Sequence, residues 1–344
     1  MIKLILKRLL LLPFVMLGVT ALLFSILQFL SPEMRASLYV KDPRQLAHLD
    51  EIIHQYGLDK PMPVQYAIWL KGVAHGDLGY SETAKMPVAK AIRAFFPATA
   101  ELAIAAFFPT LIFGVLFGVL SAVYKDQWFD QLMRFVAITG YSLPSFVFGL
   151  FLLMVFYGQW RLFPPGRYSI DVDILVHSPA FNHYTGLLTF DTLLNGQFSA
   201  FIDVVKHLVL PAMTLIYIEI ALILRITRSS MLEEMGKDYI RTARSKGLSE
   251  KDVILKHALR NALIPVITLS SLLFVGLLGG VVITETVFDY PGIGHWGVVA
   301  AQQLDVPGVL GSTLLAALLF VLANLASDIL YVIVDPRMRA ENHG

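Results

Sequence analysis

The chain of 344 residues is 56% hydrophobic and only 15% charged, with a mean hydropathy of +0.66 and a formal net charge of +1. A soluble domain usually carries about 25% charged residues, so this surplus of apolar side chains predicts a membrane protein. The balanced charge gives no support to nucleic-acid binding, and the absence of cysteine excludes disulfides, thiolate metal sites and cysteine nucleophiles.

Six apolar runs are long enough to cross a bilayer, because a spanning helix needs about 20 residues. Lipid offers no hydrogen-bond partners to the backbone, so each run is expected to be a helix. The first run is too long for a signal-peptide core and is interpreted as a retained span. The runs cover residues 9–30, 98–123, 133–158, 207–224, 263–284 and 312–334. These runs predict an all-α membrane protein with six transmembrane helices.

The distribution of Lys and Arg predicts how the chain sits in the membrane. Nine basic residues lie between residues 225 and 260, and others lie at both termini and in the loop after the second run. Residues 285–311 contain none. Because short cytoplasmic loops carry the excess of basic residues, both termini are predicted to be cytoplasmic. The chain is thus expected to be a multi-pass membrane protein.

The runs also divide the chain. We expect the first span in residues 1–30, a helical segment outside the cytoplasm in residues 31–97, five spans in residues 98–336 and a cytoplasmic tail in residues 337–344. In the outer segment, one helix is predicted to end at Gly57 and another to begin at Pro63. The alternative for this segment is a helix pair lying on the lipid surface. Residues 158–206 receive no assignment.

One polar stretch, residues 238–265, interrupts the apolar chain. It predicts two short helices joined at Gly247, because glycine adopts the left-handed conformation that ends a helix without penalty. Ser249, with Asp252 three residues later, has the pattern that begins the next helix. Pro265 is expected to open the following apolar run. Together with the basic residues before it, this stretch forms a polar hairpin over residues 225–262. The hairpin predicts a docking surface for a soluble partner.

Three residues within or beside the runs have consequences for function. Glu219 lies in the fourth run, where a carboxylate is costly unless it faces a bundle interior or a water-filled path. The alternative is a structural hydrogen bond between helices. Pro144 is predicted to kink the third run. Glu101, at the outer end of the second run, is interpreted as an interfacial side chain.

Small residues recur inside two runs. Gly114 and Gly118, like Gly276 and Gly280, are four residues apart, a spacing that permits close helix packing. The packing partner is either another helix of this chain or a separate protein. Gly279 and Gly280 together weaken the fifth helix, which suits a gate or a close contact.

No motif predicts catalysis by this chain. The sequence lacks a phosphate-binding G-x-x-x-x-G-K-[ST] loop, an H-E-x-x-H metal motif and a G-x-S-x-G nucleophile elbow. We therefore predict no catalytic, cofactor-binding or metal-binding residue, and an energy source outside the chain.

The polar hairpin carries a family resemblance. Arg241-Thr242-Ala243, then Gly247, then Ile264-Pro265, resembles the EAA loop of ABC-importer permeases. The sequence DYIRTARSKGL…KHALRNALIP is similar to the permeases of the dipeptide, oligopeptide and nickel branch of this family. Arg241 stands where the loop's name implies Glu, and residues 247–265 are longer than the general loop. Both departures are familiar in the peptide branch. Further resemblances are GLDKPMPVQYAIWLKG, the re-entrant turn VFDYPGIGHWG and the ending SDILYVIVDPRMR.

The resemblance implies a type I ABC-importer permease fold with a helical periplasmic insertion after the first span. It implies a non-catalytic subunit that forms half of a pathway for short peptides. The implied partners are a second homologous permease, two ATPase subunits that bind ATP and Mg, and a periplasmic or lipid-anchored binding protein. The implied ATPase-coupling residues are Asp238, Tyr239, Arg241, Thr242, Ala243, Arg244, Lys246 and Gly247. The candidate translocation-path residues are Pro144, Glu219, Gly279, Gly280, Phe288 and Tyr290.

The sequence leaves alternatives open for the substrate and for the class of transporter. Nickel complexes, glutathione and antimicrobial peptides are carried by permeases of the same family. A proton-coupled secondary transporter would also place acids such as Glu219 in its spans, although no paired internal repeat is evident. A membrane scaffold without transport is the third alternative.

Overall fold

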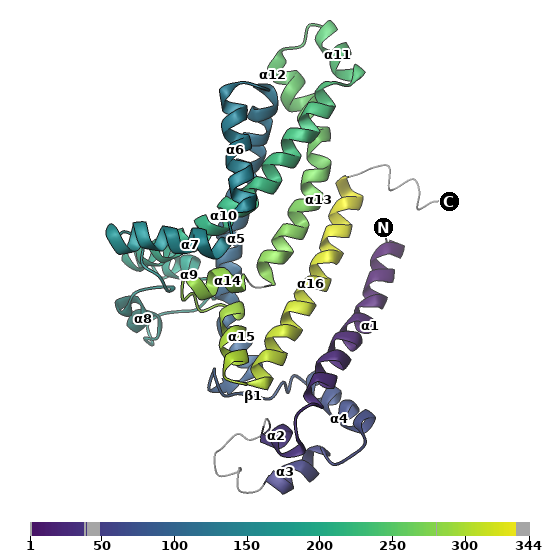
Figure 1. Ribbon diagram of the computed structural model, residues 1–344, viewed down its shortest axis with the longest axis vertical. Coiled ribbons are helices and arrows are strands. Elements are labelled where there is room, and N and C mark those ends of the chain that lie inside the picture. The colour runs from purple at the N-terminus through teal and green to yellow at the C-terminus, as the bar shows by residue number, and fades with distance from the viewer. Residues whose placement is uncertain (1, 38, 40–48, 280, 335–344) are drawn as a thin grey trace.

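The computed structural model describes residues 2–37, 39, 49–279 and 281–334. Within these residues the chain is helical, apart from one short ribbon in which β1, Tyr80–Ser81, pairs antiparallel with β2, Met86–Pro87. The long helices run side by side as an elongated bundle with small helices at both ends (Figure 1). The predicted all-α architecture is therefore confirmed for the described part of the chain.

Five helices are long, but they differ in their ability to cross a bilayer. They are α1 Ile2–Leu27, α5 Val88–Val123, α10 Phe198–Met235, α13 Leu259–Leu278 and α16 Val306–Val334. Among the described residues, α5, α10, the 29-residue helix Glu250–Leu278 and α16 through Ala326 are long and apolar enough to span. The apolar part of α1 assessed in the same way, Pro13–Leu27, is shorter. Six crossings therefore remain a prediction.

The third apolar run is two helices, not one kinked helix. Helix α6, Trp128–Ser142, and helix α7, Ser145–Leu152, with its π-helical extension Leu153–Gln159, meet at an angle of 106°. Leu143 is extended, with ψ of 122°, because the ring of Pro144 disfavours the helical conformation for the residue before it. The proline was expected to bend a span, but it separates two helices, and α7 leaves the bundle sideways (Figure 1).

Two glycines allow a close contact between α5 and α10. A Cβ atom on Gly114 would lie 2.7 Å from Cγ2 of Ile223, and one on Gly118 would lie 2.5 Å from Cβ of Thr227. Helices α5 and α10 can therefore approach only because both positions lack a side chain. Of the two alternatives for this glycine pair, packing within the chain is correct. Gly276 differs, because no atom lies within 4 Å of a Cβ built there.

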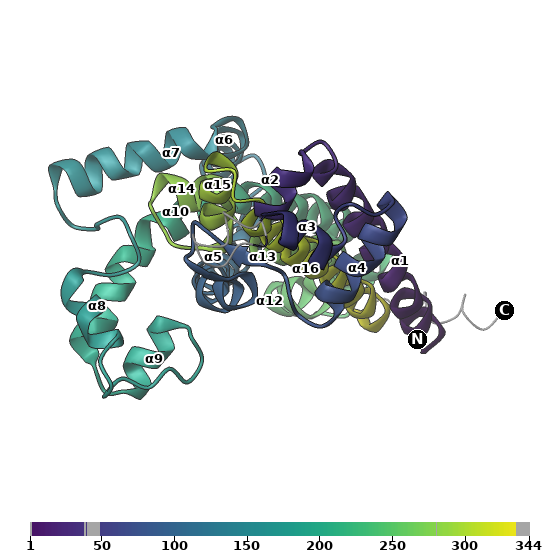
Figure 2. The same ribbon diagram turned by 90° about the horizontal axis from the view of Figure 1, so that it is seen from below.

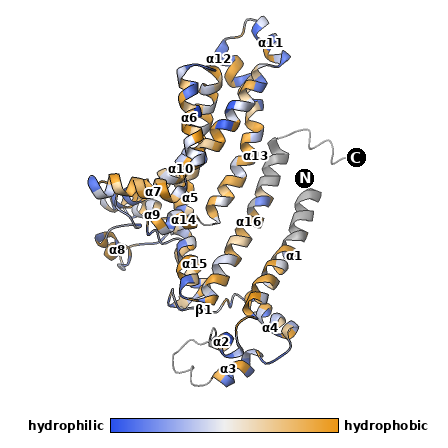
Figure 3. Ribbon diagram, viewed as in Figure 1, coloured by the Kyte–Doolittle hydropathy of each residue, from blue (hydrophilic) through white to orange (hydrophobic). Residues whose placement is uncertain are grey.

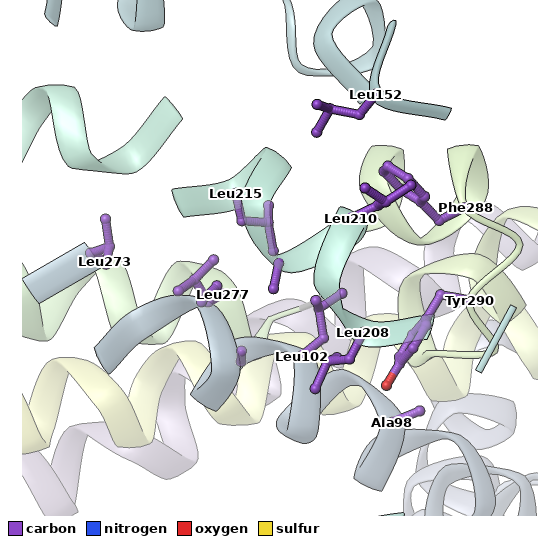
Figure 4. Close-up of a cluster of buried hydrophobic side chains, with 13 residues drawn as sticks. Ala98, Leu102, Leu152, Leu208, Leu210, Leu215, Leu273, Leu277, Phe288 and Tyr290 are labelled. Atoms are coloured by element: carbon purple, nitrogen blue, oxygen red, sulfur yellow. The ribbon is translucent and has the colours of Figure 1, made fainter. Parts of the chain in front are cut away.

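The largest core cluster lies where α5, α7, α10, α13 and residues 288–290 meet (Figure 4). Leu102, Leu210, Phe288 and Tyr290 have no exposed surface. Many large apolar side chains of the long helices are exposed. Hydrophilic residues gather at the end of the bundle that carries α11 and α12, and also on α2 and α3 at the opposite end (Figure 3). This distribution is typical of a protein whose middle is solvated by lipid.

The opposite end of the bundle holds α2 Pro32–Ser37, α3 Leu49–Tyr56 and α4 Met62–Ala74 (Figure 1). As predicted, α3 ends at Gly57, whose φ is +63°, and Pro63 lies in the first turn of α4. Arg35 ties α2 to α4, since its Nη1 donates to Oε1 of Gln65 at 2.6 Å. Helix α5 begins at Val88, ten residues before the predicted second run, so the helix continues beyond its most apolar part.

Residues 160–197, which the sequence left unassigned, form a side arm (Figure 2). The arm contains α8, Ile170–Val176, and α9, Leu188–Leu194, and it shares a small core with the start of α10. The carboxylate of Asp191 is buried and accepts hydrogen bonds from the backbone N–H groups of Thr185 and Gly186 at 2.8 and 2.9 Å. Two further helices, α14 Val282–Val287 and α15 Ile293–Gln302, follow α13.

Candidate functional site

The polar hairpin projects from one end of the bundle (Figure 1). Helix α11, Asp238–Ser245, ends before Gly247, whose φ is +77°. The next helix begins with α12, Glu250–Asp252, where Oγ of Ser249 accepts a hydrogen bond from the backbone N–H of Asp252 at 3.2 Å. Both predicted signals, the glycine stop and the serine cap, are confirmed.

The second helix of the hairpin is not short. It continues from α12 through a π-helical segment, Val253–Ala258, into α13, and Pro265 lies inside the helix without ending it. The prediction of a second short helix is therefore wrong, although Pro265 does stand at the start of an apolar stretch. One continuous helix thus joins the hairpin to α13.

Helix α11 is fixed to the bundle through its apolar face. Ile240 is fully buried and Ala243 nearly so, and they pack with Val119 and Ala122 of α5 and Met231 of α10. Burying an isoleucine side chain stabilises by about 1.5–3 kcal/mol. Ala243, one of the predicted coupling residues, thus packs inward against the chain itself.

The other face of α11 and the turn after it are exposed. The exposed members of the predicted coupling set are Asp238, Tyr239, Arg241, Thr242, Arg244, Lys246 and Gly247. Arg244 forms two bonds with Glu250 across the turn, 2.8 Å from Nε to Oε1 and 3.3 Å from Nη2 to Oε2. Such exposed pairs contribute at most about 1 kcal/mol to stability, so these groups remain available to a partner.

Tyr239 joins the three parts of the hairpin. Its hydroxyl donates to Oε2 of Glu234 at 2.5 Å and accepts from Nδ2 of Asn261 at 3.0 Å. Burial, and then the nearby carboxylate of Glu234, raise the pKa of Tyr239. The hydroxyl therefore stays protonated and donating at neutral pH. It links the end of α10 and the start of α13 to α11.

The candidate path residues do not form one cluster. Glu219 lies on α10 with intermediate exposure, and it makes no hydrogen bond or ion pair with any residue that the structure describes. Pro144 lies in the break between α6 and α7, and Gly279 ends α13. Gly280 lies outside the described residues. In the described part of the chain no hydrogen bond to another helix holds Glu219, and its role on a path stays a prediction.

Phe288 and Tyr290 are in the core instead of on a path. Both side chains are fully buried in the cluster of Figure 4. A Cβ on Gly149 of α7 would lie 3.1 Å from Cε2 of Phe288, and the Tyr290 hydroxyl donates to Oε2 of Glu101 at 3.4 Å. In the described chain these two aromatic residues attach residues 288–292 to α7 and α5, and neither side chain is exposed.

Comparison with known proteins decides the family. Residues 114–340 match the family of binding-protein-dependent transport system inner membrane components, and residues 1–103 match the N-terminal family of the same membrane components. The chain belongs to this family. The matched region beginning at residue 114 includes the polar hairpin and Glu219, and the chain is therefore an integral membrane subunit.

Relatives of this inner membrane component cover nearly its whole length. The dipeptide transport system permease protein of Escherichia coli K12 is 41% identical over 343 residues, 98% of this chain and 99% of the relative. The probable D,D-dipeptide transport system permease protein of the same strain is 42% identical over 321 residues, 93% of each chain. An oligopeptide transport system permease protein of Bacillus subtilis is 38% identical over 325 residues, covering 94% and 95%.

A buried ion pair lies beside the hairpin of this inner membrane component. The Arg228 guanidinium of α10 forms a bidentate contact with the Asp130 carboxylate of α6. Nε lies 2.6 Å from Oδ1, and Nη2 lies 2.8 Å from Oδ2. The same carboxylate accepts the hydroxyl of Ser121 in α5 and, at 2.9 Å, the backbone N–H of Asp126. Sequence reasoning missed this pair, because Asp130 lies before the third predicted run and no local pattern connects it to Arg228.

A second buried pair fixes the side arm. Arg167 donates through Nε and Nη2 to Oε2 of Glu101, at 3.2 and 2.9 Å, and the backbone N–H of Thr189 donates to Oε1 at 2.6 Å. Glu101 is 3% exposed, so its interpretation as an interfacial side chain is wrong. The side arm, α5 and Tyr290 are joined at this carboxylate.

Glu285 organises the turn that resembled the family's re-entrant segment. Its buried carboxylate accepts from the Thr99 hydroxyl at 2.7 Å and from the backbone N–H of His295 at 2.8 Å. A Cβ on Gly292 would lie 2.3 Å from the Glu285 carboxyl group, so only glycine fits. The N-terminus of α15 thus binds an anion, but the anion is a side chain of the chain itself.

Proposed function

We propose that this permease subunit forms one half of the membrane pathway of an ATP-driven importer of short peptides. The observation that carries the proposal is the full-length likeness to dipeptide transport system permease proteins, at 41% identity over 98% of the chain. The relatives differ in the peptide class that their names give, so the proposal extends to short peptides as a class. Nickel complexes, glutathione and antimicrobial peptides are the alternatives within the family.

ATP hydrolysis belongs to separate subunits in this proposal. The sequence has no phosphate-binding loop, and the exposed basic hairpin suits docking onto ATPase subunits that bind ATP and Mg. The implied complex contains two such ATPases, a second homologous permease and a binding protein. This chain would supply the pathway and the docking surface, and no catalytic group.

The orientation follows from charge. The end that carries α11 and α12 holds the concentration of basic residues, which supports placing it in the cytoplasm. The start of α1 and the end of α16 are directed toward the same end of the bundle, away from α2, α3 and α4 (Figure 1). We therefore assign both termini to the cytoplasm and residues 31–97 to the periplasm, with six crossings of the inner membrane.

Transport proceeds by alternating access in this proposal. Closure of the ATPase subunits displaces α11, and α10 and the continuous helix from α12 to α13 move with it. The pathway then opens to the periplasm and accepts a peptide from the binding protein, and ATP hydrolysis restores the inward-open state. Glu219 is the path residue we assign to the positively charged amino terminus of the peptide.

The test is reconstitution of the complete complex in proteoliposomes. The chain is purified in mild detergent from its native membrane with its partners, and uptake of a labelled dipeptide is followed with ATP inside the vesicles. Vanadate should stop uptake and a protonophore should leave it unchanged. Recovery of the chain alone, or uptake that the protonophore stops and vanadate does not, contradicts the proposal and favours a proton-coupled carrier.

A further inference from the structure

The buried pair of Asp130 and Arg228 lies at the junction of three helices near the polar hairpin. The Asp130 side chain has no exposed surface, although Arg134 comes within 3.8 Å of it from the exposed side. Donors reach its two oxygens from α5, from the turn between α5 and α6, and from α10. The carboxylate is thereby held in one orientation, because a bidentate guanidinium contact fixes both distance and direction.

The pair joins α6 to the helices that carry α11. The buried cluster around Ile240 and Ala243 takes its described members from α5, α10, α11, the π-helical segment and α13, and none from α6. Ser121 and Ala122 are adjacent in α5, so one contacts the Asp130 carboxylate while the next belongs to this cluster. On α10, Met231 of the cluster lies one turn beyond Arg228. A displacement of α11 that moves Met231 would therefore also move Arg228, which lies one turn away on the same helix.

A second contact carries the displacement further along α6. The hydroxyls of Thr139 and Tyr217 lie 2.8 Å apart, and a Cβ on Gly140 would lie 2.8 Å from the carbonyl oxygen of Tyr217. Helix α6 is thus attached to α10 at both ends and leads directly into the break at Pro144. Beyond the break, α7 packs against Phe288 and Val287. The route runs from the hairpin end to the core of the opposite half.

We propose that Asp130 and Arg228 are a positioning pair that transmits the displacement of α11 to α6 and α7. The inference rests on the proposed function, because it assumes that ATPase subunits move α11. The pair touches neither substrate nor ATP. Its effect is on how tightly peptide movement follows ATP hydrolysis. Loss of the bidentate contact leaves α6 attached to α10 only at its far end, through Thr139, Gly140 and Tyr217, so α6 and α7 follow α10 less closely.

The experiment compares Arg228→Lys with Arg134→Gln in the complete reconstituted complex. Lysine keeps the positive charge but cannot form two parallel bonds with one carboxylate. Arg134 is the matched control, since it is a nearby arginine whose side chain is 47% exposed and only 3.8 Å from Asp130. We expect the number of peptides taken up per ATP hydrolysed to fall about tenfold in Arg228→Lys, the range of a typical coupling energy, and to be unchanged in Arg134→Gln.

A distance measurement separates transmission from general damage. The chain has no cysteine, so spin labels can be attached at Leu150→Cys of α7 and Gln303→Cys after α15, both of which are exposed in the chain. Vanadate trapping should change the distance between the labels in the otherwise native complex and leave it unchanged in Arg228→Lys. A variant weakened only in stability would keep this change in the fraction that assembles.

The outcomes are distinct. An assembled Arg228→Lys complex that transports with the native ratio, or whose labels move normally, overturns the inference and leaves the proposed function intact. Absence of ATP-driven peptide uptake in the native complex overturns both. If Arg228→Lys does not assemble, Ser121→Ala replaces it, because it removes one hydrogen bond and keeps the ion pair. A ratio at least twofold below native then supports the inference, and a native ratio overturns it.

Discussion

At the scale of single residues, each buried carboxylate that the structure describes has donors that hold it. In the described part of the chain the buried acids are Glu101, Asp130, Asp191, Glu285 and Asp305. Each accepts hydrogen bonds from residues that other elements or turns supply. Burying a charge without such partners costs several kcal/mol. Glu219 differs, because it lies in a span and no described residue holds it.

This contrast leads to a prediction for Glu219→Gln. If the carboxylate binds the ammonium group of a peptide, its loss should raise the KM for dipeptide uptake about tenfold, since a hydrogen bond between charged groups is worth about 1.5–3 kcal/mol. Uptake of an N-acetylated dipeptide, which has no ammonium group, serves as the control and should not change. Equal effects on both peptides, or loss of the assembled complex, would show a structural role instead.

A second residue-scale prediction uses the two glycine pairs. Gly118→Ala places a methyl group 2.5 Å from Cβ of Thr227, so it should destabilise the chain by about 1–3 kcal/mol through overpacking. Gly276→Ala meets no atom within 4 Å and should leave the isolated chain unaffected. Thermal unfolding of both variants in detergent, followed by size-exclusion chromatography, measures the difference. Equal unfolding temperatures would contradict the close contact of α5 and α10.

Residues with local signals were predictable, and those with distant partners were not. Gly247 and Ser249 each act on the backbone within a few positions, so the sequence alone located the helix end and the helix start. Asp130 and Arg228 are 98 residues apart, and no local pattern connects them. The burial of Phe288 and Tyr290 likewise depends on α7 and α5, which only the folded chain brings to them.

At the scale of elements, hydropathy located the apolar parts of the long helices but not the ends of those helices. The apolar runs mark the part of a helix that lipid surrounds, so residues 88–97 of α5 and 225–235 of α10, which carry charges, were left out of the predicted spans. The break at Pro144 shows the converse limit. A proline predicts a bend, but the 106° angle is set by the packing of α7 against Phe288 and α10, which the sequence does not reveal.

The turn of the polar hairpin gives an element-scale prediction. Gly247→Val puts a β-branched residue at a φ of +77°, which costs about 1–2 kcal/mol and should change the angle between α11 and α12. ATP hydrolysis should continue while peptide uptake falls. Gly236→Ala is the matched control, because Gly236 has a φ of −82° and accepts a methyl group without strain. Native uptake by Gly247→Val would exclude the turn from coupling.

At the scale of the whole molecule, the two ends of the bundle differ in chemistry. One end presents the basic hairpin, and the other presents the β-ribbon, α15 and the small helices α2 to α4 (Figures 1 and 3). Helix α5 contacts two buried arginine–carboxylate pairs. Its Glu101 pairs with Arg167 of the side arm, and nearer its other end Ser121 donates to Asp130, which pairs with Arg228 of α10. The long helix α5 therefore anchors the side arm toward one end and α6 toward the other.

The proposed orientation predicts which end a reagent reaches from outside. In intact spheroplasts, a membrane-impermeant maleimide should label Glu82→Cys, which is exposed between β1 and β2. Ser245→Cys, exposed on α11, should react only after the membrane is permeabilised. The native chain has no cysteine, so it supplies the unlabelled background. The reverse pattern would invert the assignment of the two ends.

The length of α10 has a consequence for the lipid in which the protein works. Its 38 residues extend about 57 Å, whereas the hydrocarbon core of a bilayer is about 30 Å thick. If α10 crosses the bilayer, much of it stands in water as a stalk, and the hairpin is held beyond the headgroups. Changing the acyl-chain length by a few carbons would therefore alter where the lipid boundary falls on α10 without bringing the hairpin into it. Attachment of soluble subunits should be insensitive to membrane thickness, even where the rate of transport is not.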